Sequence, residues 1–524
     1  MLDKGFFVLL QHKKLSTFAP IIESNKPFLK SLKMNEEMKK PVVAEEFESE
    51  LNSWVDQEKK AVDLNNTVGS LLYGQSVELV LFRNHLVDRS VSEVLKMHKN
   101  AQNFTNRPVS VYETSSLAKE MLELNLAPSK IDIGKLANDW LKEEENFDSR
   151  KDFLINKLEG FIGAEKRKLE PKDVILYGFG RIGRIAAREL IKQAGKGQQL
   201  RLRAIVTRND DETAMKKRAA LLRNDSVHGS FNGTVEVDTV NRIMFINGQQ
   251  VNLIDAQQPD DIDYTKYGIN DALVIDNTGV FKDKAALSRH LKSKGVSKVI
   301  LTAPGKEIPN IVYGVNHKND IELEEDKIIS AASCTTNAIV PVLKVIEDSL
   351  GIEKGHIETV HAYTNDQNLL DNMHSKTRRG RSAAINMVIT ETGAGKAVTK
   401  VIPSLQDKLT ANAVRVPTPN GSLAIMNLTV GKETSVEDIN ELLRKAALEG
   451  DLVNQIYFST DGETVSSDII GNTCCSVYDS PATIVSTDKK NIVLYVWYDN
   501  EFGYTKQVIR LAKYVAQVRR LIYY

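Results

Sequence analysis

The chain has 524 residues, of which 42% are hydrophobic and 26% charged, and its 69 basic and 69 acidic residues leave no formal net charge. This composition is ordinary for a globular protein of roughly two to four domains, and it excludes a chain-wide field that would recruit nucleic acid or an anionic membrane. No apolar run reaches the roughly 18 residues that a membrane helix needs. The three cysteines favour a reducing compartment, and hence a cytoplasmic protein, over a disulfide framework. No His/Cys spacing indicates a metal site.

Residues 1–45 predict a poorly structured N-terminal segment, because Lys and Asn are frequent and hydrophobic periodicity is weak. A polar stretch begins at Met34, which makes this methionine an alternative translation start. The apolar run 5–10 is short and no clear small-residue cleavage site follows it, so we expect no signal peptide.

Residues 46–169 predict a helical extension. Apolar side chains recur at helical spacing in three stripes, which are Phe47, Leu51 and Trp54, then Val87, Val91, Val94 and Leu95, then Leu154, Leu158, Phe161 and Ile162. Such stripes predict the buried core of a helical packing module. Ser90 and Glu93 have the spacing of a helix-capping box. No catalytic constellation falls in this segment, and a regulatory or partner-binding role is its alternative.

From residue 170 onward, short β-branched runs alternate with helical stretches, which predicts an α/β fold with a parallel, doubly wound sheet. These runs are 174–177, 202–207, 272–277, 298–302 and 328–331. We therefore expect a Rossmann-type domain over 170–333, completed by a C-terminal helix within 500–524. Longer strand-like runs at 356–364, 411–417, 422–430 and 491–498 predict a second, α+β domain over 334–499.

A dinucleotide fingerprint follows the first of these strands. Gly178, Gly180 and Gly183 form a G-x-G-x-x-G run between strand 174–177 and helical residues 184–191. The glycines allow a tight turn and close approach of the backbone to a pyrophosphate, which then faces a helix N-terminus. This strand–turn–helix context predicts NAD or NADP binding.

The end of the second strand bears on the choice between the two cofactors. An acid at this point binds the ribose 2′-hydroxyl of NAD, but Thr207 or Arg208 occupies the position here. An arginine attracts a 2′-phosphate and favours NADP. In the alternative, Arg208 is a solvated charge and Asp210 shifts back to serve NAD.

Cys334 and His361 lie on separate predicted elements and can meet in the fold as a nucleophile and its base. A thiol that attacks a carbonyl beside a nicotinamide predicts aldehyde oxidation. The adjacent Cys474 and Cys475 are interpreted as structural thiols.

Residues 172–524 resemble phosphorylating glyceraldehyde-3-phosphate dehydrogenase along their whole length, whereas the preceding segment resembles no family that we can name. The resemblance rests on the motifs at 178–184, 277–281, 332–337, 392–398, 415–419 and 497–501.

The resemblance implies oxidation of D-glyceraldehyde 3-phosphate to 1,3-bisphosphoglycerate through a thioester on Cys334, reversibly, in glycolysis or gluconeogenesis. His361 would pair with the Cys334 thiolate, lower the pKa of the thiol and act as general base. The backbone amide of Cys334, with His361, would stabilise the oxyanion. A cytoplasmic homotetramer that binds no nucleic acid or membrane is expected.

The resemblance also implies the ligand-binding residues. Those for the cofactor are Gly178, Gly180, Arg181, Ile182, Gly183, Thr207, Arg208, Asn277, Thr278, Gly279, Phe281, Thr302, Asn500 and Tyr504. Those for the C3 phosphate are Thr364, Asp366, Arg379 and Arg415, with Arg378 and Arg381 as alternatives to Arg379. Those for inorganic phosphate are Ser333, Thr335, Thr392 and Gly393.

The sequence departs from the family pattern in two places that bear on the cofactor. Tyr177 replaces the common asparagine before the fingerprint, and loop 371–374 lacks the Leu-Pro pair of many NAD-specific members. The loop agrees with Arg208 in favouring NADP. Two other functions remain open, namely an erythrose-4-phosphate dehydrogenase and a regulatory or scaffold protein that acts through the helical extension.

Overall fold

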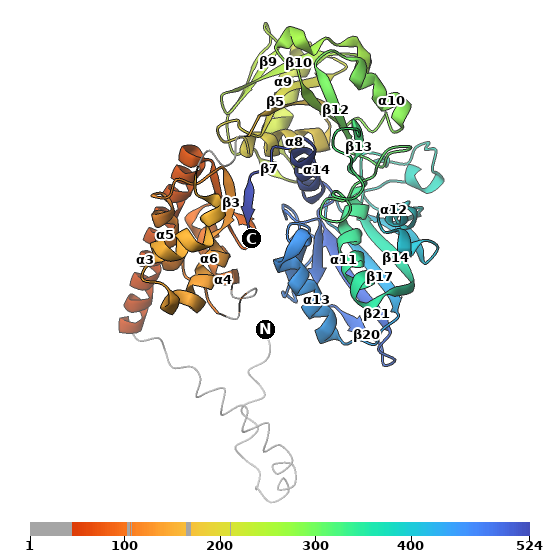
Figure 1. Ribbon diagram of the computed structural model, residues 1–524. Helices are drawn as coiled ribbons and strands as arrows, with labels where there is room; N and C mark the ends of the chain where they lie inside the picture. The colour runs from red at the N-terminus through yellow and green to blue at the C-terminus, as the bar shows by residue number, and fades with distance from the viewer. Residues whose placement is uncertain (1–43, 102–104, 106, 164–168, 210) are drawn as a thin grey trace, which may run out of the picture. The chain divides into compact units, whose positions relative to one another are not determined.

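The structure is a computed structural model that describes residues 44–101, 105, 107–163, 169–209 and 211–524. Met34, most of the segment 1–45 and Asp210 therefore lie outside the described residues. The chain divides into two compact units, Met1–Lys59 and Lys60–Tyr524. The elements are labelled in Figure 1.

Helix α3 (Ala44–Ser70) provides the described part of the first unit. Its apolar stripe is exposed, with relative exposures of 56% for Phe47, 44% for Leu51 and 47% for Trp54. The prediction that this stripe is buried core was therefore wrong. Within the second unit, the later part of α3 contributes Ala61, Leu64 and Val68 to an apolar cluster.

The segment from Lys60 to residue 163 is mainly helical, and a small sheet runs through it. Its further helices are α4 (Val91–Ala101), α5 (Val111–Met121), α6 (Ile133–Glu143) and α7 (Arg150–Lys157). The Ser90–Glu93 capping box of α4 is confirmed, because each backbone N–H donates to the other residue's side chain, at 2.9 and 3.2 Å.

The sheet of this segment has the order β2-β1-β3-β22. Its strands are β1 (Val77–Leu81), β2 (Asn84–His85), β3 (Ser129–Asp132) and β22 (Leu521–Tyr523). The sequence did not predict these strands, because β1 is buried along its whole length and shows no alternation of polar and apolar residues. Strand β22 brings the C-terminal end of the chain into parallel pairing with β3.

The predicted doubly wound sheet is confirmed. Eight strands lie in the order β13-β12-β11-β4-β5-β10-β9-β8, and those from β13 to β10 pair in parallel. They are β4 (Lys172–Tyr177), β5 (Leu200–Thr207), β8 (Val235–Asp238), β9 (Ile243–Ile246), β10 (Gln249–Asp255), β11 (Ala272–Asp276), β12 (Val296–Leu301) and β13 (Ile328–Ser330). The accompanying helices are α8 (Arg181–Lys192), α9 (Glu212–Arg223) and α10 (Lys284–Ser288). The two-stranded sheet β6 (Asn224–Asp225) and β7 (Gly229–Ser230) follows α9.

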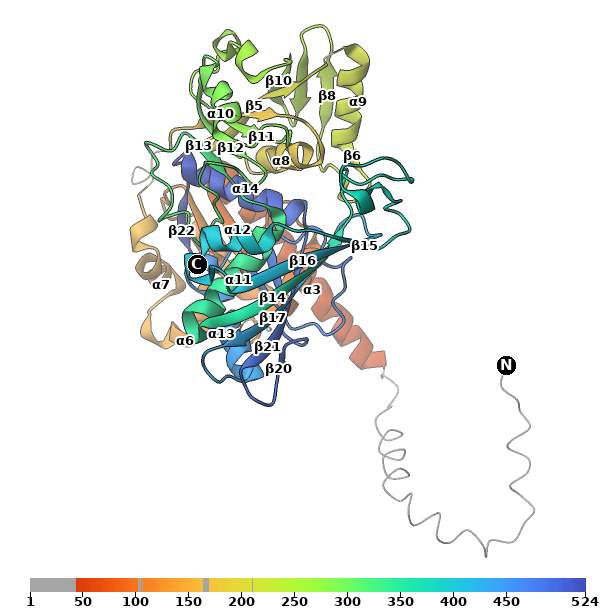
Figure 2. The same ribbon diagram turned by 90° about the vertical axis from the view of Figure 1, so that its right-hand side faces the viewer.

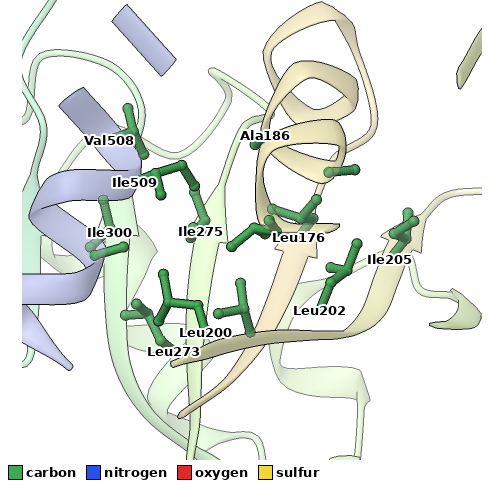
Figure 3. Close-up of a cluster of buried hydrophobic side chains, with 14 of the residues drawn as sticks. Leu176, Ala186, Leu200, Leu202, Ile205, Leu273, Ile275, Ile300, Val508 and Ile509 are labelled. Atoms are coloured by element: carbon green, nitrogen blue, oxygen red, sulfur yellow. The ribbon is translucent and has the colours of Figure 1, made fainter. Parts of the chain in front are cut away.

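The core of this domain lies between the sheet and helices α8 and α14 (Phe502–Val515). Figure 3 shows Leu176 and Ile275 of the central strands close to Ala186 of α8 and to Val508 and Ile509 of α14. All five side chains are buried. The C-terminal helix therefore completes the dinucleotide-binding domain, although more than 300 residues separate it from strand β4.

A second large sheet follows Cys334, with the order β15-β16-β14-β17-β21-β19-β18, and β20 pairs with β21. Figure 2 shows β16, β14, β17 and β21 side by side. The strands are β14 (Ile352–Ala362), β15 (Val388–Thr390), β16 (Leu409–Val416), β17 (Ser422–Val430), β18 (Ile456–Ser459), β19 (Ser476–Asp479), β20 (Ile484–Val485) and β21 (Asn491–Tyr498). The helices are α11 (Cys334–Leu350), α12 (Ala394–Val401) and α13 (Val436–Leu448).

A C-terminal helix lies within 500–524, as expected: helix α14 ends at Val515, and Leu521–Tyr523 after it forms strand β22, which the sequence did not predict. The pairing partner of β22 lies in the extension, so local sequence could not reveal it. Among the described residues, no helix is both long and apolar enough to cross a membrane.

Candidate active site

Cys334 is the first residue of helix α11. The Oγ of Ser333 caps the helix by accepting a hydrogen bond from the Thr336 N–H at 3.0 Å. The N–H of Cys334 therefore belongs to the first turn, whose amides have no helical acceptor and where the helix dipole favours negative charge. Ala332 has a left-handed φ of 56°, a strained conformation for alanine. The Tyr504 hydroxyl donates to the Ala332 carbonyl at 2.9 Å and holds this turn in place.

His361 lies near the end of strand β14, and its Nε2 is 3.6 Å from the Sγ of Cys334. Its Nδ1 is 2.7 Å from the carbonyl oxygen of Ala362. With the proton on Nδ1, the ring donates to this carbonyl and the Nε2 lone pair faces the thiol, as a general base requires; with the proton on Nε2, Nδ1 instead accepts from the Arg415 guanidinium, which lies 2.7 Å away. The two residues that the sequence nominated as nucleophile and base therefore lie together.

Arg415 lies opposite His361 in the register of strands β14 and β16. Its Nη1 donates to the Ala362 carbonyl at 2.8 Å and is 2.7 Å from Nδ1 of His361. Its Nε is buried without a hydrogen-bond partner in the described part of the chain. A cation with an unused donor beside the thiol is suited to bind an anionic substrate.

The pKa shifts of Cys334 and His361 do not favour the thiolate at Cys334 that the family resemblance implies. Burial raises the pKa of the Cys334 thiol, and the nearby Arg415 only partly offsets this. Burial, together with the charge of Arg415, lowers the pKa of His361 to about 3. The protein groups alone therefore favour a neutral thiol beside a neutral imidazole.

Arg379 is a member of the arginine cluster whose charge acts on His361. It forms an ion pair with Asp366, and its Nε donates to Thr390 Oγ1 at 3.1 Å. Its charge also contributes to the low pKa of His361. Arg381 instead pairs with Asp371 on an exposed surface, so the geometry favours Arg379 over it. Thr364 lies two residues after the end of strand β14 and is half-buried.

The residues predicted to hold inorganic phosphate lie at two helix N-termini. Gly393 caps helix α12, and Thr392 Oγ1 accepts a hydrogen bond from the Ala394 N–H at 3.2 Å. Helices α11 and α12 contact each other. The Oγ of Ser333 already caps α11, whereas Thr335 Oγ1 shares a hydrogen bond of 3.1 Å with the Tyr498 hydroxyl.

The sequence reasoning missed Tyr498, although it lies within the motif 497–501. Its ring packs edge-on against His361 with centroids 5.8 Å apart. Burial raises the pKa of its phenol, so the hydroxyl stays protonated and can donate to an oxygen near Thr335. The alternation of strand β21 places this side chain inside, which is the signal that could have identified it.

The fingerprint glycines form a cradle that other residues would fill. Gly178 has a φ of 92°, and a Cβ at Gly183 would lie 2.4 Å from the Gly178 carbonyl oxygen. Asn277 Oδ1 is buried without a hydrogen-bond partner in the described residues. These features fit a dinucleotide whose pyrophosphate approaches the backbone closely.

A pocket of about 590 Å³ lies beside this cradle. It is lined by Tyr177, Gly178, Phe179, Gly180, Val206, Thr207, Arg208, Asn209, Arg218, Ala256, Gln257, Gln258, Asn277, Thr278, Val280 and Phe281. Arg208 is exposed at the end of β5, and Arg218 of α9, which the sequence reasoning missed, lines the same pocket. None of these described lining residues is acidic, which favours a ligand with additional negative charge.

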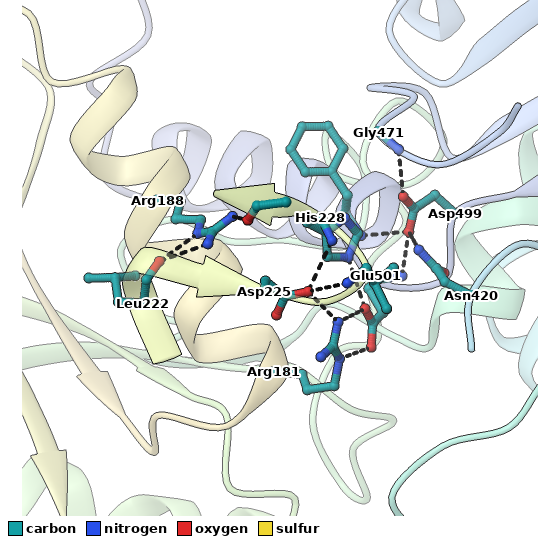
Figure 4. Close-up of polar contacts among 12 residues, drawn as sticks. Arg181, Arg188, Leu222, Asp225, His228, Asn420, Gly471, Asp499 and Glu501 are labelled. Carbon is teal, nitrogen blue, oxygen red and sulfur yellow. Dashed lines mark hydrogen bonds and ion pairs between the residues drawn. The ribbon is translucent and has the colours of Figure 1, made fainter. Parts of the chain in front are cut away.

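Arg181 serves a different purpose from the one its motif suggests. Figure 4 shows its guanidinium paired with Asp225 and Glu501, and His228 Nε2 is 2.9 Å from the same Glu501. These contacts join α8 to the residue that precedes α14. Because its guanidinium is committed to these carboxylates, the backbone of Arg181 is what a cofactor phosphate would meet.

Two of the remaining predicted cofactor residues, Thr302 and Asn500, form side-chain hydrogen bonds within the protein. Thr302 Oγ1 donates to the Asp276 carbonyl at 3.0 Å, and Asn500 Oδ1 accepts from Ser422 Oγ at 2.9 Å. The Asn500 amide nitrogen is thereby directed away from Ser422 and can meet a carboxamide. Ile182 is half-buried at the start of α8, and Gly279 has a φ of 67°.

Comparisons with known proteins identify both large domains. The NAD-binding domain of glyceraldehyde 3-phosphate dehydrogenase matches residues 172–284, and the C-terminal domain of that enzyme matches residues 333–500. The chain is 39% identical over 352 residues to glyceraldehyde-3-phosphate dehydrogenase of Clostridium pasteurianum, covering 66% of this chain and 99% of the relative. The enzyme of that name from Zymomonas mobilis is 39% identical over 346 residues, with 66% and 98% covered.

One relative also matches part of the extension. A glyceraldehyde-3-phosphate dehydrogenase-like protein of Pseudomonas aeruginosa is 49% identical over 455 residues, which cover 86% of this chain and 98% of the relative. This match is longer than the segment 172–524 and so includes residues in front of it. The chain therefore belongs to the glyceraldehyde-3-phosphate dehydrogenase family of oxidoreductases and carries an additional N-terminal segment.

Proposed function

We propose that the protein is a phosphorylating dehydrogenase that converts D-glyceraldehyde 3-phosphate, inorganic phosphate and NAD(P)⁺ to 1,3-bisphosphoglycerate and NAD(P)H. The observation that carries this proposal is the 3.6 Å contact between Cys334 Sγ and His361 Nε2 beside Arg415. A nucleophilic thiol, a base and an anion-binding cation are the groups that the oxidation of a phosphorylated aldehyde needs.

The reaction begins when Cys334 Sγ attacks the aldehyde carbon and the thiol proton passes to His361 Nε2. The Cys334 amide at the start of α11 and the imidazolium Nε2–H would stabilise the developing oxyanion, and transfer of the Nε2 proton to this oxygen yields the hemithioacetal. The neutral His361 then removes the hydroxyl proton as hydride leaves the same carbon, and a thioester remains on Cys334. The bound nicotinamide supplies the hydride acceptor. Inorganic phosphate attacks the thioester, releases the acyl phosphate and restores the thiol.

Bound substrate would raise the lowered pKa of His361. Arg415 and Arg379 both lower the pKa of His361, and a C3 phosphate bound between them would offset their charge. The imidazole then becomes a stronger base once substrate is present. Asp366, which pairs with Arg379, would orient that guanidinium, and Thr364 would supply a further hydrogen-bonding group.

The cofactor would lie over Gly178, Gly180 and Gly183, and we assign NADP as the preferred form. Arg208 and Arg218 line the pocket beside Thr207, and both can meet a 2′-phosphate. NAD use through Asp210 is the alternative. Steady-state rates with NAD and NADP as the varied cofactor decide between them.

We also propose a cytoplasmic homotetramer, active in glycolysis or gluconeogenesis. The thiols of Cys334, Cys474 and Cys475 are free, which suits a reducing compartment. Segment 369–389 exposes apolar side chains, with Leu370, Met373 and Ile385 exposed by 75%, 93% and 78%, and a neighbouring subunit would cover them. Light scattering of the full chain measures the assembly.

The phosphate dependence of turnover tests the proposed reaction. With glyceraldehyde 3-phosphate as substrate, NAD(P)H formation should require inorganic phosphate, because a thioester that is not released blocks further turnover. Equal rates with and without phosphate would contradict the proposal and favour the erythrose-4-phosphate dehydrogenase, which releases its thioester to water. Absence of turnover with either aldehyde would favour the regulatory or scaffold role.

A further inference from the structure

A second group of basic side chains, of which Lys506 and Arg520 are buried, lies inside the unit Lys60–Tyr524. A cavity of about 70 Å³ is lined by residues from the extension, from helix α14 and from the segment that leads into β22. Its Lys and Arg residues are Lys130, Lys506, Arg510, Lys513, Arg519 and Arg520, whereas Glu78 is its only carboxylate side chain among the described lining residues. We refer to it as the cationic cavity.

Three of these cations lie on one face of α14, because Lys506, Arg510 and Lys513 follow helical spacing. Lys506 is paired with Glu189 of α8 at 2.6 Å. Arg510 Nη1 donates to the carbonyls of Asn454 and Thr473, at 2.6 and 3.0 Å. The helix therefore brings three basic side chains to the cavity, and within the described residues Lys506 is the one that pairs with a carboxylate.

Lys513 is bonded to neutral groups. Its Nζ donates to the side-chain oxygens of Gln193 and Gln199, at 2.7 and 3.1 Å. Burial and the charges of neighbouring cations outweigh Glu78 and lower the pKa of Lys513 to about 7. A buried ammonium in such surroundings gains most from a nearby anion.

Glu78 contacts three basic side chains at once, which are His85, Lys130 at 3.6 Å and Arg520 at 3.0 Å. Arg520 has 5% of its side chain exposed, and its Nε has no hydrogen-bond partner in the part of the chain that the structure describes. One carboxylate cannot satisfy this many buried donors. The cavity thus has excess positive charge together with an unused buried N–H.

We propose that the cationic cavity binds a phosphate-sized, multiply charged oxyanion, either inorganic phosphate or the phosphate group of a monoester. Lys513, Arg510 and Arg520 supply the charge-assisted hydrogen bonds, and the volume admits one such group. Because Lys130 and Glu78 come from the extension and the other cations from the C-terminal part of the chain, a bound anion holds the two together. This site is separate from the proposed chemistry and does not depend on it.

Anomalous diffraction with arsenate, an isostere of phosphate, locates the anion directly. Crystals of the full chain soaked in arsenate should show a peak within hydrogen-bond reach of Lys513 Nζ. Peaks near Arg415 in the same crystals show that the soak succeeded. A successful soak without a peak in the cationic cavity overturns the proposal, since ordered water then fills the space.

Equilibrium dialysis with labelled inorganic phosphate tests the site in solution. Lys513→Met removes the charge, keeps an unbranched side chain and leaves no carboxylate unpaired, although the side-chain oxygens of Gln193 and Gln199 lose this donor. The variant should bind phosphate at this site about tenfold more weakly, which corresponds to the loss of one charge-assisted hydrogen bond. The exposed Lys445→Met on α13 is the matched control and should bind as the unmodified chain does. Equal binding by the Lys513→Met and Lys445→Met variants contradicts the proposal.

A competition arm identifies the source of the anion. Glycerol 2-phosphate should displace labelled phosphate from the cavity if its mouth admits an ester, and should fail to do so if only the free ion fits. Sodium chloride at matched ionic strength controls for screening. Displacement by chloride alone indicates unspecific attraction and contradicts a phosphate-sized site.

Discussion

The Cys334 site and the cationic cavity both contain several basic side chains, but their charges act on different neighbours. At the Cys334 site, Arg379 is paired with Asp366, and Arg415 is beside His361, whose pKa is lowered by burial and by this charge. In the cavity, the cations lower one another's pKa values, as at Lys513.

The difference shows what an anion would do in each place. At the Cys334 site it would restore the basicity of His361 and so promote a reaction. In the cavity it would relieve repulsion between segments that are far apart in the chain and so stabilise their association. We therefore expect similar residue types to serve chemistry in one region and assembly of the fold in the other.

The largest effect is expected from Cys334→Ser. A serine hydroxyl cannot replace the thiol as nucleophile, so kcat should fall by at least about a thousandfold. Steady-state NAD(P)H formation measures this. Cys474→Ser is the control, because Cys474 is buried away from the pair and its replacement should leave activity nearly unchanged. Comparable activity of the two variants would remove Cys334 from the mechanism.

His361→Gln should lower kcat by about 10² to 10⁴, the range for loss of a general base. The state of the pair can be read separately from the pH dependence of Cys334 alkylation by iodoacetamide. Since burial raises the pKa of the thiol and lowers that of His361 to about 3, the rate should rise only in the alkaline range. An inflection near neutral pH that disappears in His361→Gln would instead demonstrate a thiolate–imidazole pair.

Glu78→Gln tests how much the ion pairs of the cationic cavity contribute to protein stability. Removing the carboxylate leaves Lys130 and Arg520 without their anionic partner and should lower the free energy of unfolding by about 3 kcal/mol. Burial raises the pKa of Glu78, but Lys130 and His85 outweigh burial and hold this pKa well below 4.5. The contribution of the Glu78 carboxylate to stability is therefore present above about pH 4.5 and is lost as the pH falls toward the pKa of Glu78 in the folded protein.

Urea unfolding at several pH values checks this prediction. Glu123→Gln is the control, because Glu123 forms an exposed pair with Lys151 and should change stability little. Inorganic phosphate should restore part of the stability lost in Glu78→Gln if the proposed anion site exists. Equal stability of the two variants would mean that Glu78 does not hold the extension in place.

The smallest effect is expected from a substitution in the cofactor pocket, Arg208→Ala. It should reduce kcat/KM for NADP about tenfold, through loss of a charge-assisted contact to the 2′-phosphate, and leave kcat/KM for NAD nearly unchanged. Lys445→Ala, on an exposed helix face, controls for the general loss of a positive charge. A parallel decrease with both cofactors would show that Arg208 does not read the 2′ position.

The sequence by itself determined the dinucleotide-binding domain and predicted the nucleophile and base that we propose. Residues such as Gly178 and Gly183 are required by local backbone geometry, and the parallel strands around them have continuous apolar runs that local periodicity reveals. Cys334 and His361 lie within short motifs, so a family resemblance identifies them without knowledge of distances. The contacts of Tyr498 could not be predicted from the sequence, because its partners Thr335 and His361 lie on α11 and β14.

Only the tertiary structure revealed the burial that shifts the pKa values of Cys334 and His361, the ion pairs of Arg181, and the cationic cavity. Each depends on burial and on groups from distant parts of the chain, such as Arg415 beside His361 and Glu501 beside Arg181. The same holds for strand β22, whose partner β3 lies almost 400 residues earlier. A local pattern specifies what a residue can do, whereas its surroundings after folding fix its pKa, its partners and therefore its role.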